Sequence, residues 1–173
     1  KNIINSSELQ FLYGHLPFKI HNKLNNKYLF ITIVREPIQR CISHYAWAIS
    51  KNYISKNEDI DDLFESNKLP QNAIVNQFSG KDMSKSNNDE LINLSLYNLS
   101  NKIDLLFDIE DLAILLNLII SSYDLPNLFF SKQQVNYNKI RISEKTIEKI
   151  SKYNAQDIIL YSKLLQNNLI KSY

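Results

Sequence analysis

The sequence predicts a helix-rich α/β fold with a small parallel sheet, and two apolar runs are the main reason. Residues 28 to 34 are mostly aromatic and β-branched, with Thr32 the one member that is not hydrophobic. A run that is apolar at both odd and even positions is typical of a parallel strand buried on both faces. Residues 103 to 107 predict a second, shorter strand. Elsewhere most apolar residues recur at helical spacing, so helices outnumber strands.

The predicted helices begin at residues that commonly start helices. Pro37 fits the first turn, where its missing N–H is harmless, and the helix after it runs to about residue 51. Asp108 and Ser143 can each cap a helix, and Asn154 with Asp157 three residues later can cap the last one. The full set of predicted helices is 37–51, 58–66, 70–78, 88–99, 108–123, 143–153 and a last helix from 154.

Composition limits the classes of protein to which the chain can belong. Its 173 residues, 44% of them hydrophobic, are enough for one domain with a sizeable core, so residues 1–173 are predicted to be a single domain. The net charge of +2 is spread along the chain without a basic stripe, which argues against nucleic-acid binding. The longest apolar stretch, 103–120, carries four acidic residues and is not predicted to span a membrane.

Cysteine usage indicates a reducing compartment and no metal site. Cys41 is the single cysteine, and no Cys/His cluster has the spacing of a zinc site. Cys41 lies among apolar helix positions, so we expect a small core residue rather than a nucleophile. With no signal peptide in the sequence, the prediction is a cytoplasmic protein.

Arg35 directly follows the first predicted strand and precedes the helix that begins at Pro37. In open parallel sheets, ligands bind outside the carboxyl ends of the strands. A guanidinium can donate two parallel hydrogen bonds to an oxyanion, and Ser43 lies two helical turns beyond Glu36 on the same face. The positive helix N-terminus adds to the attraction. We therefore expect an anion site, although Arg35 in an ion pair and Ser43 bonded to its own backbone remain alternatives.

Several segments, taken in order, resemble the carbohydrate sulfotransferases related to heparan sulfate 2-O-sulfotransferases and their bacterial relatives. The strand-to-helix segment with Arg35-Glu-Pro37, Arg40 and Ser43-His-Tyr45 is similar to the arginine-acid-proline motif of that family. The other similar segments are Tyr13–Phe18 (its Gly-His segment), Asn76–Gly80, Ile103–Leu116 and Leu125–Leu128.

The resemblance implies a partial P-loop-NTPase-like parallel sheet flanked by helices, and an enzyme that transfers a sulfuryl group from 3′-phosphoadenosine 5′-phosphosulfate to a hydroxyl, usually on a sugar, without a metal. It implies that Arg35 and Ser43 bind the 3′-phosphate of this co-substrate. It also implies that His15 is the general base, a role that its ordinary pKa near 6.5 suits. A structural turn histidine is the alternative for His15. The modest charge favours a neutral or lightly charged glycan acceptor.

The chain departs from this family at its amino-terminal end. Nothing before residue 11 supplies the lysine-containing loop that holds the 5′-phosphosulfate, so the first strand-loop-helix unit is expected to be missing. The chain starts with Lys1 rather than Met, which favours a fragment that is inactive by itself. The lost start could also have held a membrane anchor, as in Golgi members of such families. A non-catalytic sulfotransferase-like module that binds glycan or protein is an alternative, and another phosphate-using transferase is a third.

Overall fold

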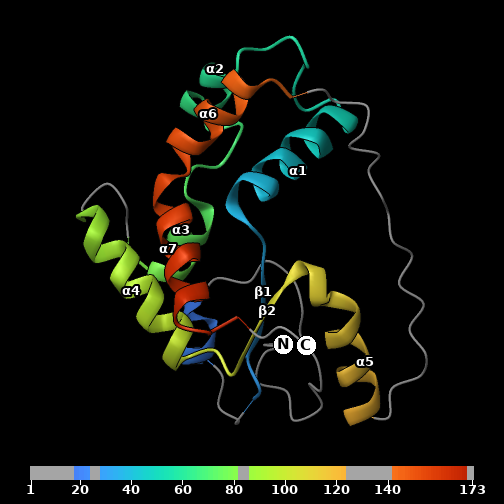
Figure 1. Cartoon of the computed structure of the whole chain (residues 1–173), viewed down its shortest axis with the longest axis vertical. Coiled ribbons are helices and arrows are strands. Elements are labelled where there is room, and N and C mark those ends of the chain that lie inside the picture. Colours follow the sequence, from blue (N-terminus) through green and yellow to red (C-terminus); the bar gives the residue numbers. More distant parts are fainter. Residues whose placement is uncertain (1–17, 24–27, 82–85, 124–141, 171–173) are drawn as a thin grey trace.

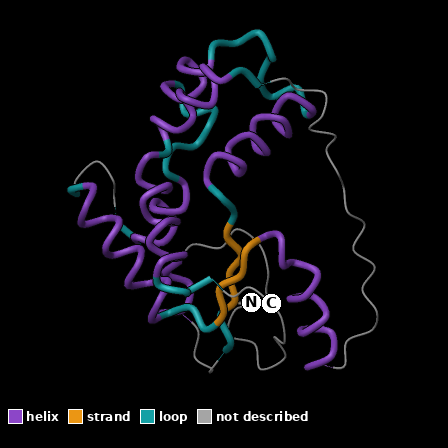
Figure 2. The backbone as a smooth tube through the Cα atoms, in the orientation of Figure 1, coloured by secondary structure: helices purple, strands orange, loops and turns teal. Residues whose placement is uncertain are grey.

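The computed structural model describes residues 18–23, 28–81, 86–123 and 142–170. Within these ranges the protein is a helix-rich α/β fold with a small two-stranded parallel sheet flanked by helices, as predicted (Figures 1 and 2). Its elements, with η marking a 3₁₀-helix, are η2 (Phe18–Lys23), β1 (Ile31–Val34), α1 (Pro37–Ser50), α2 (Ile60–Glu65), α3 (Ala73–Ser79), α4 (Asn88–Asn101), β2 (Leu105–Asp108), η4 (Ile109–Asp111), α5 (Leu112–Tyr123), α6 (Glu144–Tyr153) and α7 (Ala155–Gln166).

The two strands pair in parallel with Ile31 opposite Leu105 and Val34 opposite Asp108. Figure 1 shows α3, α4 and α7 on one side of this sheet and α5 on the other. The prediction that β1 is buried on both faces is wrong, because Val34 is 4% exposed whereas Ile33 on the opposite face is 39% exposed. One face of β1 packs into the core and the other stays partly open, which the apolar run alone did not reveal.

Two hydrophobic cores lie along the molecule. The first is formed where α3, α4 and α7 meet the sheet, and its buried members are Val34, Ile74, Val75, Phe78, Leu91, Ile92, Leu99, Leu106, Leu160 and Leu164. The second lies between α1, α2 and α6, and its buried members are Cys41, Tyr45, Ala48, Ile54, Ile60, Leu63, Phe64, Leu69 and Ile150. Among the described helices, none is long and apolar enough to cross a membrane.

The N-termini of α3 and α7 cap each other in the region between the two cores. The buried carboxylate of Asp157 accepts hydrogen bonds from the backbone amides of Ile74 at 2.9 Å and Val75 at 2.8 Å. In return Asn72 Oδ1 accepts hydrogen bonds from the amides of Gln156 at 3.0 Å and Asp157 at 3.3 Å. The exchange satisfies amides that neither helix could satisfy from its own residues.

This exchange replaces the capping box predicted for the last helix. Asn154 precedes α7 as predicted, but its side chain makes no capping bond to that helix. Its Nδ2 donates to the Ile150 carbonyl at 2.9 Å, and its Oδ1 accepts from the Asn72 amide at 3.2 Å. The predicted caps at Ser143 and Asp108 are confirmed, with bonds from Thr146 N at 3.1 Å and Glu110 N at 3.0 Å.

Asparagine takes the place of glycine after several helices of this chain, which has only two glycines. Asn52, Asn67 and Asn168 follow the ends of α1, α2 and α7 with φ of 57°, 58° and 51°. After α7, Asn168 N donates to the Leu165 carbonyl at 3.0 Å and Leu169 N donates to the Leu164 carbonyl at 3.0 Å. These are the two bonds of a Schellman motif, which requires a left-handed residue at this position.

We expect Asn168→Gly to stabilise the protein, because glycine adopts a positive φ without the steric cost of a Cβ. The gain in the free energy of unfolding should be at most about 1 kcal/mol, measured by urea denaturation. Asn117→Gly is the matched control, since Asn117 is exposed within α5. There the same change should destabilise by about 0.3 kcal/mol, because glycine is a slightly poorer helix former than asparagine. If both substitutions changed the free energy of unfolding in the same direction, the left-handed conformation of Asn168 would be contradicted.

Candidate functional site

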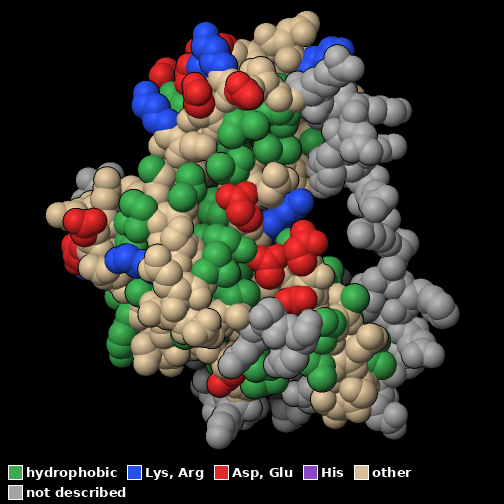
Figure 3. All heavy atoms as spheres, in the orientation of Figure 1, with side chains coloured by type: hydrophobic (Ala, Val, Ile, Leu, Met, Phe, Trp, Pro, Cys, Tyr) green, Lys and Arg blue, Asp and Glu red, His purple; other side chains and the backbone are tan. Residues whose placement is uncertain are grey.

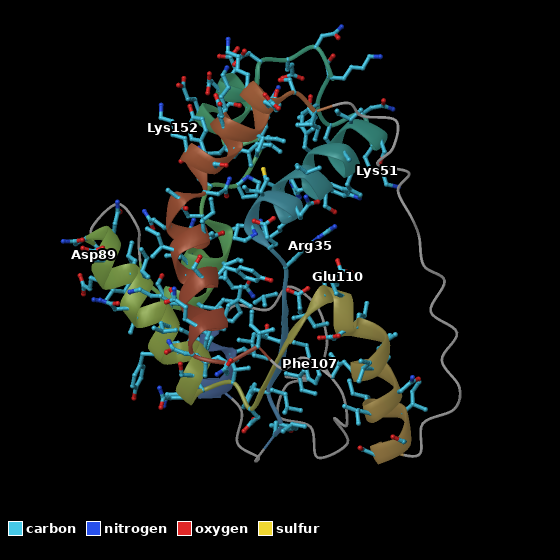
Figure 4. The ribbon with its side chains drawn as sticks, viewed as in Figure 1. Arg35, Lys51, Asp89, Phe107, Glu110 and Lys152 are labelled. Atoms are coloured by element: carbon cyan, nitrogen blue, oxygen red, sulfur yellow. The ribbon has the colours of Figure 1, made fainter. Side chains whose placement is uncertain are left out.

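The candidate site lies where the carboxyl ends of the two strands meet. Because Val34 pairs with Asp108, the next residue, Arg35, leaves β1 beside the end of β2. Figure 4 shows the Arg35 side chain extending from the strand end between α1 and η4, with Glu110 on the η4 side. We call Arg35, Glu36, Asp108, Glu110 and Tyr161 together the strand-end site. Its position is the one predicted for a ligand in a parallel sheet.

Arg35 has hydrogen-bonding capacity that the described protein does not use. Its Nε is buried and has no hydrogen-bond partner. None of the ion pairs between described residues includes Arg35, so the alternative of a surface ion pair finds no support within those ranges. Buried donors are almost always paired, and an unpaired one costs about 1–3 kcal/mol. Arg35 therefore keeps a donor that the described residues do not use.

Glu36 changes the prediction made for the N-terminus of α1. Its carboxylate accepts hydrogen bonds from the amides of Ile38 at 3.1 Å and Gln39 at 2.7 Å, so it caps the helix next to Pro37. The predicted contribution of the helix N-terminus to anion binding is reduced, because a carboxylate of the protein already accepts hydrogen bonds from two of its amides. Anion binding at this site therefore depends on side chains, above all on Arg35.

Asp108 and Tyr161 join the end of β2 to α7. The Tyr161 hydroxyl donates to Asp108 Oδ2 at 2.6 Å, and Asp108 Oδ1 accepts from the Glu110 amide. Burial raises the pKa of Tyr161 well above its ordinary value, and the hydrogen bond to Asp108 and the charges of Asp108, Glu36 and Glu110 raise it further. Tyr161 therefore stays protonated and remains a donor to Asp108 at neutral pH.

The strand-end site brings negative charge close to Arg35. In Figure 3 acidic side chains surround a basic group in the middle of this face, at the position where Figure 4 labels Arg35. Both oxygens of Glu36 and both of Asp108 already accept hydrogen bonds, which compensates part of their charge. The remaining negative charge opposes an anionic ligand, so any oxyanion at this site depends on the guanidinium.

Of the other two predicted site residues, Ser43 is among the described residues and His15 is not. Ser43 is half-buried on α1, in the second turn after the helix start, so it lies on the element that begins at Arg35. His15 lies outside the described residues, as do most of the Tyr13–Phe18 segment and all of Leu125–Leu128. Asn76, from the third similar segment, is exposed and donates through Nδ2 to the Gln71 carbonyl at 2.8 Å.

Cys41 is a core residue, as predicted. It is 2% exposed, and burial raises the pKa of its thiol to about 11, against the lowering effect of Arg40. A thiol with this pKa is protonated at neutral pH and is a poor nucleophile. Within the described ranges, no three His, Cys, Asp or Glu side chains are grouped so that they could hold a metal ion.

Glu36, Asp108 and Tyr161 belong to the site and were missed as site residues by sequence reasoning. The sequence marks Glu36 only as the acid of the Arg35-Glu-Pro37 segment and Asp108 only as a helix cap. A signal did exist for Asp108, because it ends the second predicted strand and carboxyl ends of neighbouring parallel strands lie together. Tyr161 carries no such signal, because its helix lies far along the chain.

Comparisons of the chain with models of protein families, with curated proteins and with solved structures find no match.

Proposed function

We propose that this chain contains the donor-binding and catalytic portion of a sulfotransferase that uses 3′-phosphoadenosine 5′-phosphosulfate and a glycan acceptor. The observation that carries the proposal is Arg35, whose buried and unpartnered Nε lies at the carboxyl end of a parallel strand. The resemblance of the Arg35-Glu-Pro37 segment to the family motif supplies the identity of the anion, which is the 3′-phosphate of the co-substrate.

Within the strand-end site, the guanidinium of Arg35 is the group that supports a phosphate monoester as ligand. The guanidinium fork matches two phosphate oxygens, and such charge-assisted pairs are stronger than neutral hydrogen bonds. In the proposal, Ser43 on α1 contributes a hydroxyl to the same phosphate. Asp108 and Glu36 lie near the guanidinium, and the oxygens of both carboxylates accept hydrogen bonds from other groups of the protein.

In the proposed reaction, an acceptor hydroxyl oxygen forms a bond to sulfur while the bond between sulfur and the bridging phosphate oxygen breaks. His15 takes the hydroxyl proton, and adenosine 3′,5′-bisphosphate leaves with the electron pair of the broken bond. The loop that would hold the 5′-phosphosulfate belongs to the intact enzyme in this proposal, which we place in the cytoplasm of a bacterium. The 3′-phosphate half of the donor site can be tested on the chain alone.

The test is a calorimetric titration of the full chain with adenosine 3′,5′-bisphosphate and, separately, with adenosine 5′-monophosphate. We expect binding that requires the 3′-phosphate and that weakens at least tenfold in Arg35→Lys, because a hydrogen bond to a charged group is worth about 1.5–3 kcal/mol. Arg35→Lys retains the positive charge, so a loss of affinity reports the loss of the planar fork.

Arg40→Lys is the matched control, since Arg40 lies on α1 and its charge acts on Cys41 and Asp157 rather than on the strand-end site. It should bind adenosine 3′,5′-bisphosphate as the unmodified chain does. Equal affinity of the unmodified chain for the two nucleotides, or equal affinity of Arg35→Lys and the unmodified chain, would overturn the proposal.

A non-catalytic sulfotransferase-like module that binds glycan is the second candidate, and Glu36 is the observation that favours it. Because Glu36 occupies the first amides of α1, the site holds an anion with fewer groups than a typical phosphate site at a helix N-terminus. This candidate predicts glycan binding without any Arg35-dependent nucleotide binding.

A further inference from the structure

The guanidinium of Arg35 forms no ion pair with the carboxylates that lie near it. Arg35 directly follows Val34, which pairs with Asp108 across the sheet, and Glu36 is the next residue along the chain. In Figure 3 acidic side chains surround the basic group on this face. Nevertheless Arg35 takes part in none of the ion pairs between described residues, and its Nε is unpartnered there. Guanidinium and carboxylate pair strongly when they meet, so other groups must hold these carboxylates.

The start of α1 holds the carboxylate of Glu36. One oxygen accepts a hydrogen bond from the Ile38 amide at 3.1 Å, and the other accepts one from the Gln39 amide at 2.7 Å. Both donors lie within three residues of Glu36, so these bonds form together with the first turn of the helix. Glu36 is therefore engaged whenever α1 is formed.

The carboxylate of Asp108 is held by one local donor and one distant donor. Oδ1 accepts from the Glu110 amide at 3.0 Å, two residues further along the chain. Oδ2 accepts from the Tyr161 hydroxyl at 2.6 Å, and this donor lies on α7, 53 residues away. Burial, followed by the bond to Asp108, raises the pKa of Tyr161, so the hydroxyl keeps its proton at neutral pH. The restraint on Oδ2 therefore comes from the packing of α7 on the sheet.

We propose that Tyr161 is a positioning residue that keeps the Asp108 carboxylate from pairing with Arg35 and so leaves the guanidinium open to an oxyanion. This inference rests on the proposed use of Arg35 as an anion donor. Without the hydroxyl, Oδ2 has one engaged partner fewer and turns to the unpaired guanidinium that leaves the neighbouring strand. An anion must then break that ion pair before it can bind. Tyr161 thus acts on anion binding without touching the ligand.

Chemical modification of Arg35 by phenylglyoxal tests the proposal without any ligand. Arg35 is one of three arginines in the sequence, and mass spectrometry of peptides follows its modification. We expect Arg35 to react in the chain without substitutions and to react at least tenfold more slowly in Tyr161→Phe, because a paired guanidinium is shielded from the reagent. Addition of Asp108→Asn to Tyr161→Phe should restore the rate to within twofold. The neutral amide forms no ion pair, and its oxygen can still accept from the Glu110 amide.

Tyr153→Phe is the matched control, because the Tyr153 hydroxyl also bonds to a carboxylate, that of Asp61. Tyr153 lies on α6 beside the core between α1, α2 and α6, outside the strand-end site. Its substitution should leave the modification rate of Arg35 unchanged. Thermal unfolding of each variant shows that it is folded at the temperature of the reaction.

Three results would overturn the proposal. The first is an equal rate for Arg35 in Tyr161→Phe and in the chain without substitutions. The second is a slow rate that Asp108→Asn does not restore, because a general disturbance of α7 is not reversed by a second substitution. The third is an Arg35 that does not react in the chain without substitutions, since its guanidinium would then not be open.

The affinity for adenosine 3′,5′-bisphosphate provides a second measurement on the same variants. Tyr161→Phe should weaken binding at least tenfold, and the added Asp108→Asn should restore it. Chemical modification needs no nucleotide, so its result stands even if the chain binds none. Failure of the proposed function and failure of the positioning role of Tyr161 are therefore told apart.

Discussion

Asp157→Ala is expected to lower the free energy of unfolding by about 2–5 kcal/mol, because it leaves two buried amides without partners. Asp157 is 1% exposed, and its carboxylate takes the hydrogen bonds of Ile74 N and Val75 N at the start of α3. Urea denaturation followed by circular dichroism at neutral pH measures the loss.

Asp89→Ala is the matched control for this prediction. Asp89 also lies in the first turn of a helix, α4, but it is exposed. Its removal costs only a favourable interaction with the helix dipole, less than about 1 kcal/mol. Similar losses for the two variants would show that Asp157 acts as an ordinary first-turn acid and not as the cap of α3.

The stability contributed by Asp157 depends on pH in an uncommon direction. Burial raises the pKa of this carboxyl above its ordinary value of 3.8, against the lowering effects of the Ile74 and Val75 amides and of Arg40. The folded protein therefore holds the proton more tightly than the unfolded chain does. Relative to Asp157→Asn, the unmodified protein should lose stability as the pH rises from 3.8 through the folded pKa. If instead the unmodified protein gained stability relative to Asp157→Asn as the pH rises, the raised pKa would be contradicted.

Phe64→Ala is the second substitution expected to have a large effect, with a loss of about 3–5 kcal/mol. Phe64 is fully buried in the core between α1, α2 and α6, and its ring stacks on Tyr153 with centroids 4.4 Å apart and planes inclined by 16°. Removal of the ring opens a cavity and also deprives Tyr153 of its partner. The midpoint and slope of urea denaturation measure the effect.

A double-mutant cycle separates the stacking from the burial in this prediction. Phe64→Leu retains an apolar side chain but not the stacked ring, and Tyr153→Leu does the same from α6. The double variant should lose less stability than the sum of the two single variants, and the difference is a coupling energy of about 0.5–1.5 kcal/mol for the aromatic pair. Strictly additive losses would mean that the ring contact contributes nothing beyond burial.

The elements of the fold could be predicted because their signals are local. Pro37 at the start of α1, Ser143 at the start of α6 and Asp108 at the end of β2 all act on residues within a few positions. The helix ends were also predicted to within two residues, but the left-handed residues that follow them were not recognised, although a signal existed. Asn52 and Asn168 are the left-handed residues after α1 and α7, and in a chain so poor in glycine, asparagine just after an apolar helical stretch indicates a helix end.

The burial of β1 and the contacts at the candidate site could not be predicted from such local signals. Whether Ile33 faces solvent depends on which elements cover that side of the sheet. The capping of α3 by Asp157 joins residues 83 positions apart. No periodicity or motif encodes such a pair, because both helices would form with many different neighbours.

The sequence by itself determined that an arginine leaves a strand just before a helix, since strand, arginine and proline are adjacent along the chain. Only the tertiary structure decided what surrounds that arginine. It placed Glu36 on the helix amides, Asp108 and Tyr161 beside the strand end, and no described partner on Arg35 Nε. The physical reason is that hydrogen bonds and charges act through distance in space, whereas a sequence records only distance along the chain.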